Sequence, residues 1–123
     1  MSYDCRLIDH VSGETLLLDA PHMMQGGTYA IGGTREAWLT ITFNYSNFYY
    51  ECHPEGIKFL NGKSGAESIP FLQSMIETIK KNHPALETNP DYWKSCAGNA
   101  VIPLYQLRAL AQLRPDGVWE IQA

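Results

Sequence analysis

The segment Gly62-Lys63-Ser64-Gly65 combines residue types that bind phosphate. It stands directly before a stretch with helical periodicity, and the start of a helix offers unpaired backbone N–H groups at the positive end of the helix dipole. Lys63 adds a positive charge. The segment is not a Walker A loop, because Ile57 occupies the position of that motif's first glycine. A turn followed by an ordinary helix cap stays open as the other interpretation.

Residues 43–50 form a second candidate for binding, with five aromatic side chains in eight residues. Aromatic rings stack on nucleobases, and Asn or Ser side chains read base edges, so Asn44, Tyr45 and Ser46 are candidate ligand-binding residues. Burial in a sheet accounts for Phe43 and Tyr45 alone. The remaining aromatic residues indicate an exposed side, which is a pocket or an oligomer interface, and we expect a homo-oligomer.

Arg108 completes the predicted ligand-binding set of Lys63, Ser64, Gly65, Asn44, Tyr45, Ser46 and Arg108. It falls beside the apolar stripe of the last helix rather than opposite it. An arginine in this place either extends along the edge of the core or reaches a carboxylate or ligand phosphate. We expect the strand that ends near Asn44 to pack against this helix.

No catalytic or metal-binding motif accompanies these candidates. The four His and three Cys residues include no H-x-x-x-H or C-x-x-C spacing, so we expect no metal and no cofactor. A G-x-S-x-G nucleophile motif is also missing. Cys52 or Cys96 paired with a distant histidine stays open as a nucleophile, but no catalytic residue is predicted.

Composition indicates one domain over residues 1–123 and excludes several classes of protein. The net charge of −4 and the scattered basic residues argue against binding to a nucleic-acid polymer. No apolar h-region and no long apolar run are present, so we expect a cytoplasmic protein with no membrane partner. The odd number of cysteines predicts free thiols.

Hydrophobic periodicity predicts an α+β fold, with an antiparallel sheet of four to six strands and two helices packed on one face. A capping box at Ser64 opens a helix that continues to Asn82, and Asn99 caps a helix that ends near Leu113. The strands are expected at 5–11 and 14–19 (a hairpin around Ser12-Gly13), 28–31, 37–45, 48–51, 57–60 and 118–121.

An ordered series of short motifs supplies a resemblance over residues 28–119. The series is Gly32-Gly33-Thr34, Asn44-Tyr45-Ser46, Gly65-Ala66-Glu67-Ser68-Ile69-Pro70, Asp91-Tyr92-Trp93, Gly98-Asn99-Ala100 and Arg114-Pro115-Asp116-Gly117. It resembles small uncharacterised proteins encoded by phages and other mobile elements of Gram-positive gut bacteria. The resemblance implies an accessory protein inside a bacterium, of a kind that binds a host defence protein or a small signalling molecule.

Three hypotheses about function follow. The leading one is a non-catalytic protein that binds, and sequesters, a small anionic or nucleotide-like ligand. The alternative is a protein-interaction module that inhibits or recruits a host protein. The third is an enzyme without a recognisable motif. A concave pocket joining Asn44, the Ser64 helix start and an arginine would favour the first, and a flat aromatic patch the second.

Overall fold

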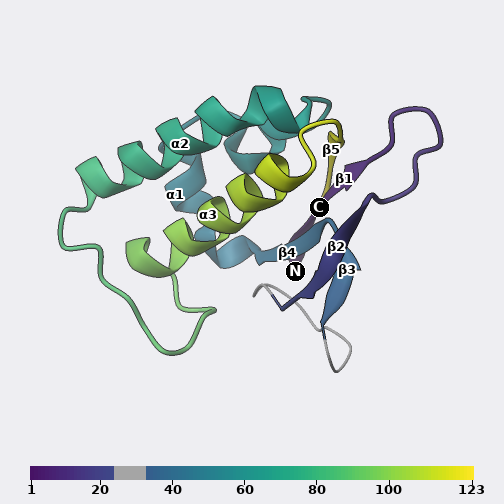
Figure 1. Ribbon diagram of the computed structural model, residues 1–123. Coiled ribbons are helices and arrows are strands. Elements are labelled where there is room, and N and C mark those ends of the chain that lie inside the picture. The colour runs from purple at the N-terminus through teal and green to yellow at the C-terminus, as the bar shows by residue number, and fades with distance from the viewer. Residues whose placement is uncertain (24–32) are drawn as a thin grey trace.

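The computed structural model describes residues 1–23 and 33–123, which form two antiparallel sheets and three α-helices (Figure 1). The chain is therefore a mixed α/β protein in which helices pack on a sheet, as the sequence predicts. The single sheet of four to six strands is wrong, because the strands divide into a three-stranded and a two-stranded sheet.

The three-stranded sheet has β1 (Ser2–Ile8) at its centre, between β4 (Trp38–Thr42) and β5 (Val118–Gln122). Both pairings are antiparallel, and Cys5 lies opposite Leu39 on one side and Ile121 on the other. Side chains alternate between the two faces of a strand, and the alternation in 37–45 correctly predicts that Leu39 and Ile41 are buried.

The second sheet pairs β2 (Leu17–His22) with β3 (Thr34–Glu36). The predicted hairpin around Ser12-Gly13 exists only at its turn, where Gly13 has a φ of 75° and Ile8 forms an isolated bridge with Thr15. After Leu16 the chain leaves β1, because β2 pairs with β3 instead. The predicted strand at 28–31 lies outside the described residues.

The aromatic segment 43–50 is helical rather than extended. A 3₁₀ turn, Phe43–Tyr45, leads into α1 (Ser46–Tyr50), and Thr42 caps the turn by accepting a hydrogen bond from the Asn44 N–H. Helical spacing places three of the rings on one buried face: Tyr45, Phe48 and Tyr49. The predicted strand at 57–60 is likewise a 3₁₀ helix, Gly56–Leu60.

Because the aromatic side chains of residues 43–50 are mostly buried within one chain, the argument for a homo-oligomer no longer holds. The core uses most of the aromatic side chains between residues 43 and 50, and only Tyr50 is substantially exposed, at 51%. The number of aromatic residues is therefore explained within one chain. The oligomeric state stays a prediction without this support.

Helices α2 (Gly65–Asn82) and α3 (Ala97–Leu113) lie side by side (Figure 1). The predicted capping box at the start of α2 is confirmed, since the Glu67 N–H donates to Ser64 Oγ and the Ser64 N–H donates to Glu67 Oε1. Helix α3 begins at Ala97, two residues before the predicted cap Asn99, whose side chain has another role.

A buried hydrogen-bonded joint connects α2 to β5. The Trp119 indole N–H donates to Ser68 Oγ at 2.8 Å, and that hydroxyl donates to the Gly65 carbonyl at 2.7 Å. The Gly65 N–H donates to the Gly117 carbonyl at 2.7 Å. A Cβ on Gly65 would stand 2.6 Å from the Arg114 carbonyl oxygen, so the backbones approach this closely only because residue 65 is glycine.

Replacing Ser68 by Ala tests this joint. The substitution leaves the buried Trp119 N–H without its acceptor, so the free energy of unfolding should fall by about 1–3 kcal/mol. Ser74→Ala on the exposed face of the same helix should change it by less than about 0.5 kcal/mol. Urea unfolding monitored by tryptophan fluorescence measures both. Equal effects of the two substitutions would contradict this role of Ser68.

Candidate functional site

The predicted ligand-binding residues lie in three separate places. Lys63, Ser64 and Gly65 stand at the start of α2; Asn44, Tyr45 and Ser46 follow β4; Arg108 lies in α3. Three cavities lined by described residues lie at β4 and α3, beside His83 and Cys96, and along β2, and none of the three joins members of different groups. The concave pocket expected to combine Asn44, the Ser64 helix start and an arginine is therefore not observed.

The start of α2 lacks the free donors on which the predicted anion site depended. The N–H groups of Gly65 and Ala66 donate to the carbonyls of Gly117 and Pro115, and those of Glu67 and Ser68 donate to the Ser64 side chain and carbonyl. The expectation of unpaired N–H groups at this helix start is wrong. The turn from α3 into β5 accepts hydrogen bonds from the N–H groups of Gly65 and Ala66, and Ser64 accepts those from Glu67 and Ser68.

The two predicted cations contact aromatic rings. Lys63 Nζ lies 5.1 Å from the ring centroid of Phe71, and Arg108 lies 5.0 Å from that of Tyr105. Arg108 also donates a hydrogen bond to the Gln73 side chain, which joins α3 to α2. Arg108 thus occupies the core-edge position that was one of its two predicted roles.

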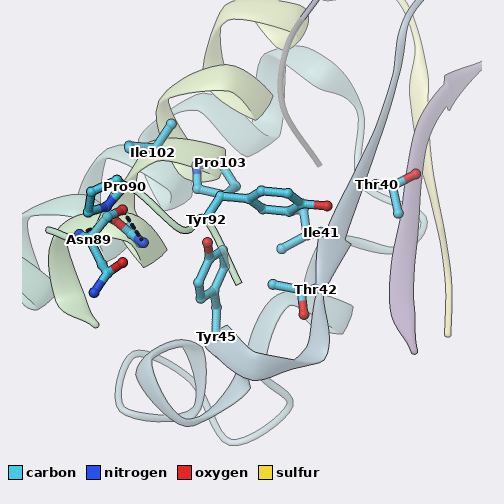
Figure 2. A pocket seen from close by; sticks show the side chains of 10 residues that line it. Thr40, Ile41, Thr42, Tyr45, Asn89, Pro90, Tyr92, Ile102 and Pro103 are labelled. Atoms are coloured by element: carbon cyan, nitrogen blue, oxygen red, sulfur yellow. Dashed lines mark hydrogen bonds between the residues drawn. The ribbon is translucent and has the colours of Figure 1, made fainter. Parts of the chain in front are cut away.

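A cavity of about 290 Å³ lies between β4, α3 and the loop that precedes α3 (Figure 2). Its walls come from three stretches of the chain that are far apart in sequence. They are Thr40, Ile41, Thr42 and Tyr45; Asn89, Pro90 and Tyr92; and Asn99, Ile102 and Pro103. Figure 2 shows the Tyr45 and Tyr92 rings close together inside this ring of residues.

Tyr45 is the one predicted ligand-binding residue that lines the cavity. The 3₁₀ turn after β4 directs its side chain inward, and its ring contacts Tyr49 edge to face at 6.5 Å. Its neighbours are engaged elsewhere: the Asn44 side chain donates to the Trp93 carbonyl, and Ser46 Oγ lies 2.7 Å from the Tyr3 hydroxyl.

The Tyr45 side chain lines the cavity, and its hydroxyl has no hydrogen-bond partner among the described residues. The residue as a whole is only 3% exposed. Burial, together with nearby Cys96, Tyr92 and Asp91, raises the pKa of Tyr45 to about 12. The hydroxyl therefore keeps its proton and can donate it in a hydrogen bond to a ligand.

Asn99 holds the loop that forms the outer wall of the cavity. Its side-chain oxygen accepts from the Asn89 N–H, and its side-chain N–H groups donate to the Asn89 and Asp91 carbonyls, each at 3.0 Å. Gly98 allows the same loop to approach, since a Cβ there would stand 2.4 Å from Thr88. These contacts place Tyr92 opposite β4.

The inner wall follows an edge of the central sheet. The Leu7 N–H donates to the Ala37 carbonyl, and the Phe43 N–H donates to the Met1 carbonyl. Hydrogen-bonded residues alternate along an antiparallel strand, so the N–H and C=O of Thr40, between these positions, point away from β1. In the part of the chain that the structure describes, neither group has a partner.

The part of the lining that the structure describes carries no charge, since no acidic, basic or histidine side chain belongs to it. Two carboxylates flank it: Asp4, whose Oδ1 accepts from the Thr40 hydroxyl at 3.2 Å, and Asp91, next to Tyr92 in the chain. The cavity is therefore suited to an uncharged group, and its surroundings are acidic.

A second, more open cavity contains the sulfur that the sequence left as a possible nucleophile. Cys96, His83 and Glu51 all line it, and His83 Nε2 lies 3.0 Å from Glu51 Oε1. Among the described residues the Cys96 sulfur makes no hydrogen bond to His83, so no base activates it in this arrangement. All three cysteines are free thiols, as predicted.

Comparison with protein-family models, with curated proteins and with solved structures gave no match for this chain. Across residues 1–23 and 33–123, no helix has both the length and the apolar character needed to span a bilayer.

Sequence reasoning missed most of the cavity lining. Tyr92 and Asn99 belong to two of the motifs in the ordered series, Asp91-Tyr92-Trp93 and Gly98-Asn99-Ala100, which were the available signal. Asn99 was interpreted as a helix cap because Asn is common there. Its real contacts reach ten residues back along the chain, to Asn89, and periodicity does not reveal them.

Replacing Asn99 by Ala should release the outer wall of the cavity. The loss of three hydrogen bonds from a 4% exposed side chain should lower the free energy of unfolding by about 2–4 kcal/mol. Hydrogen exchange at the Asn89 amide should accelerate. Asn47→Ala is the matched control, because the exposed Asn47 side chain bonds only Ser95 and should change stability by less than about 0.5 kcal/mol. Unchanged exchange at Asn89 in the Asn99 variant would contradict this role.

Alkaline pH should destabilise the fold. Burial raises the pKa of Tyr45 from 10.0 to about 12, and burial, with nearby Glu51, raises that of Cys52 from 9.0 to about 11. Both shifts favour the protonated form in the folded state. Their contribution to stability is complete below pH 9 and is lost as pH rises from 9 to 12. Urea unfolding at several pH values measures this. A free energy of unfolding that is constant up to pH 11 would contradict it.

Proposed function

We propose that this chain is a non-catalytic binding protein whose ligand places an uncharged ring with a hydrogen-bond acceptor in the cavity between β4 and α3. The observation that carries the proposal is the Tyr45 hydroxyl, a donor in the wall of the cavity for which no described residue supplies an acceptor. A ligand acceptor would add a hydrogen bond worth about 0.5–1.5 kcal/mol.

The shape and chemistry of the cavity support the same proposal. Its volume of about 290 Å³ accommodates one ring, and the rings of Tyr45 and Tyr92 supply aromatic edges and faces to its wall. The base of a nucleotide-like ligand fits these walls. A phosphate does not, because no lysine or arginine is among the described residues that line the cavity, so the ligand's charged portion, where it has one, stays outside.

Both leading hypotheses from the sequence are compatible with this chemistry. A small molecule that the protein sequesters and a host protein that it inhibits or recruits can each supply an uncharged ring. The resemblance to phage and mobile-element proteins adds the proposed setting, the cytoplasm of a bacterial host, where such an accessory protein acts against a host defence.

Titration with ring compounds tests the proposal. Thermal shift and calorimetry with p-cresol and adenosine should show binding, and adenosine monophosphate should bind no more tightly than adenosine. Tyr45→Phe removes only the hydroxyl and should weaken binding of a compound that accepts its hydrogen bond by about fivefold. Tyr92→Ala should weaken p-cresol and adenosine alike, through loss of ring contact.

Tyr50→Phe is the matched control, since Tyr50 is exposed on α1 and does not line the cavity. It should leave both affinities unchanged. The proposal fails if no ring compound binds at millimolar concentration. It also fails if binding occurs and the Tyr45 and Tyr92 substitutions leave it unaltered.

A further inference from the structure

The cavity opens along a sheet edge that has unpaired backbone groups. The N–H and C=O of Thr40 point away from β1, and no described residue bonds them. In a β-strand both groups of one residue face the same side, separated by the Cα atom. They therefore match the C=O and N–H of a residue in a neighbouring strand. A nucleobase carries its donors and acceptors on adjacent ring atoms and matches this spacing poorly.

Strand geometry relates this edge to the cavity. Successive side chains of a strand point to opposite faces, so a residue paired with Thr40 would share the face of Thr40. The residues before and after it would share the face of Ile41. That face leads into the cavity, which Ile41 lines together with Tyr45 and Tyr92. A strand beside β4 would thus direct a side chain toward the cavity that Tyr45 lines.

The charges around the edge indicate the chemistry of that strand. Asp4 lies directly opposite Thr40 on β1, so the two side chains share a face. No described basic side chain pairs with the Asp4 carboxylate, whose only bond is to the Thr40 hydroxyl. A lysine or arginine paired with Thr40 would extend over it toward Asp4, and Asp91 adds negative charge at the other side of the cavity.

We infer that the ligand of this site is an extended peptide segment of a partner protein that adds to β4 as an antiparallel strand. It places an uncharged ring with a hydrogen-bond acceptor, such as a tyrosine side chain, in the cavity and a lysine or arginine at the adjacent position, opposite Thr40. This inference rests on the proposed binding function and specifies its ligand. Backbone pairing supplies affinity, and the cavity and Asp4 supply specificity.

A positional-scanning library of blocked hexapeptides, titrated against the full chain, tests the inference. The bound peptides should be enriched in tyrosine, or another ring with a hydrogen-bond acceptor, next to a Lys or Arg. In the best peptide, N-methylation of the basic residue removes the N–H that donates to the Thr40 carbonyl and should weaken binding by about fivefold or more. N-methylation of the neighbouring ring-bearing residue is the matched control. Its N–H points away from β4, so affinity should stay within about twofold.

A protein variant supplies an independent test. Thr40→Pro removes the outward N–H, which takes no part in the ladder with β1, so the fold should be retained. The best peptide should bind this variant about fivefold or more weakly. Should the variant fail to fold, the N-methylated peptides still decide the question, because they leave the protein unchanged.

The outcomes separate this inference from the proposed function. If p-cresol binds in a Tyr45-dependent manner and no peptide exceeds a scrambled control, the peptide inference fails and the binding proposal stands. Equal effects of the two N-methylations also overturn the inference, as does adenosine binding more tightly than every peptide. If neither peptides nor ring compounds bind, both fail.

Discussion

The buried amide of Asn99 is the constraint on which the site depends. It lies in the first turn of α3, in direct contact with the loop at residues 89–91, and its three hydrogen bonds fix that loop relative to the helix. Gly98 permits the close approach. Without these hydrogen bonds the loop at residues 89–91 would not be fixed to α3. Tyr92 would then not be held across from β4, and the cavity would lose its outer wall.

The rest of the architecture positions the opposite wall. The Tyr49 hydroxyl donates a hydrogen bond to the carbonyl of Ala100, which lies 51 residues further along the chain. This bond joins α1 to the first turn of α3, the turn that contains Asn99. This contact fixes the segment after β4 and orients Tyr45 toward the cavity. Among the described residues, the Tyr45 hydroxyl and the backbone N–H and C=O of Thr40 have no partner, and a ligand that supplies one adds hydrogen bonds to the site. These positions place the uncharged side chains of the described lining around the cavity and the carboxylates of Asp4 and Asp91 beside it.

Local signals in the sequence predicted the elements that local physics controls. The capping box at Ser64, the alternation that buries Leu39 and Ile41, and the terminal strand are each set by neighbouring residues. Long-range contacts decided the rest. The aromatic residues at 43–50 suit a strand by propensity, yet burial against α3 makes them helical. Similarly, the α2 start looked free for an anion, but Gly117, 52 residues away, accepts the Gly65 N–H.

Nuclear magnetic resonance mapping of a titration with p-cresol tests the location of the site most directly. In protein labelled with ¹⁵N and with ¹³C in the tyrosine rings, the account predicts saturable shifts confined to the Tyr45 and Tyr92 rings and to amides that line the cavity, such as Thr42. The amides of Lys63, Ser64 and Arg108 should not move. Saturable shifts at the start of α2 with none at Tyr45 would contradict the account.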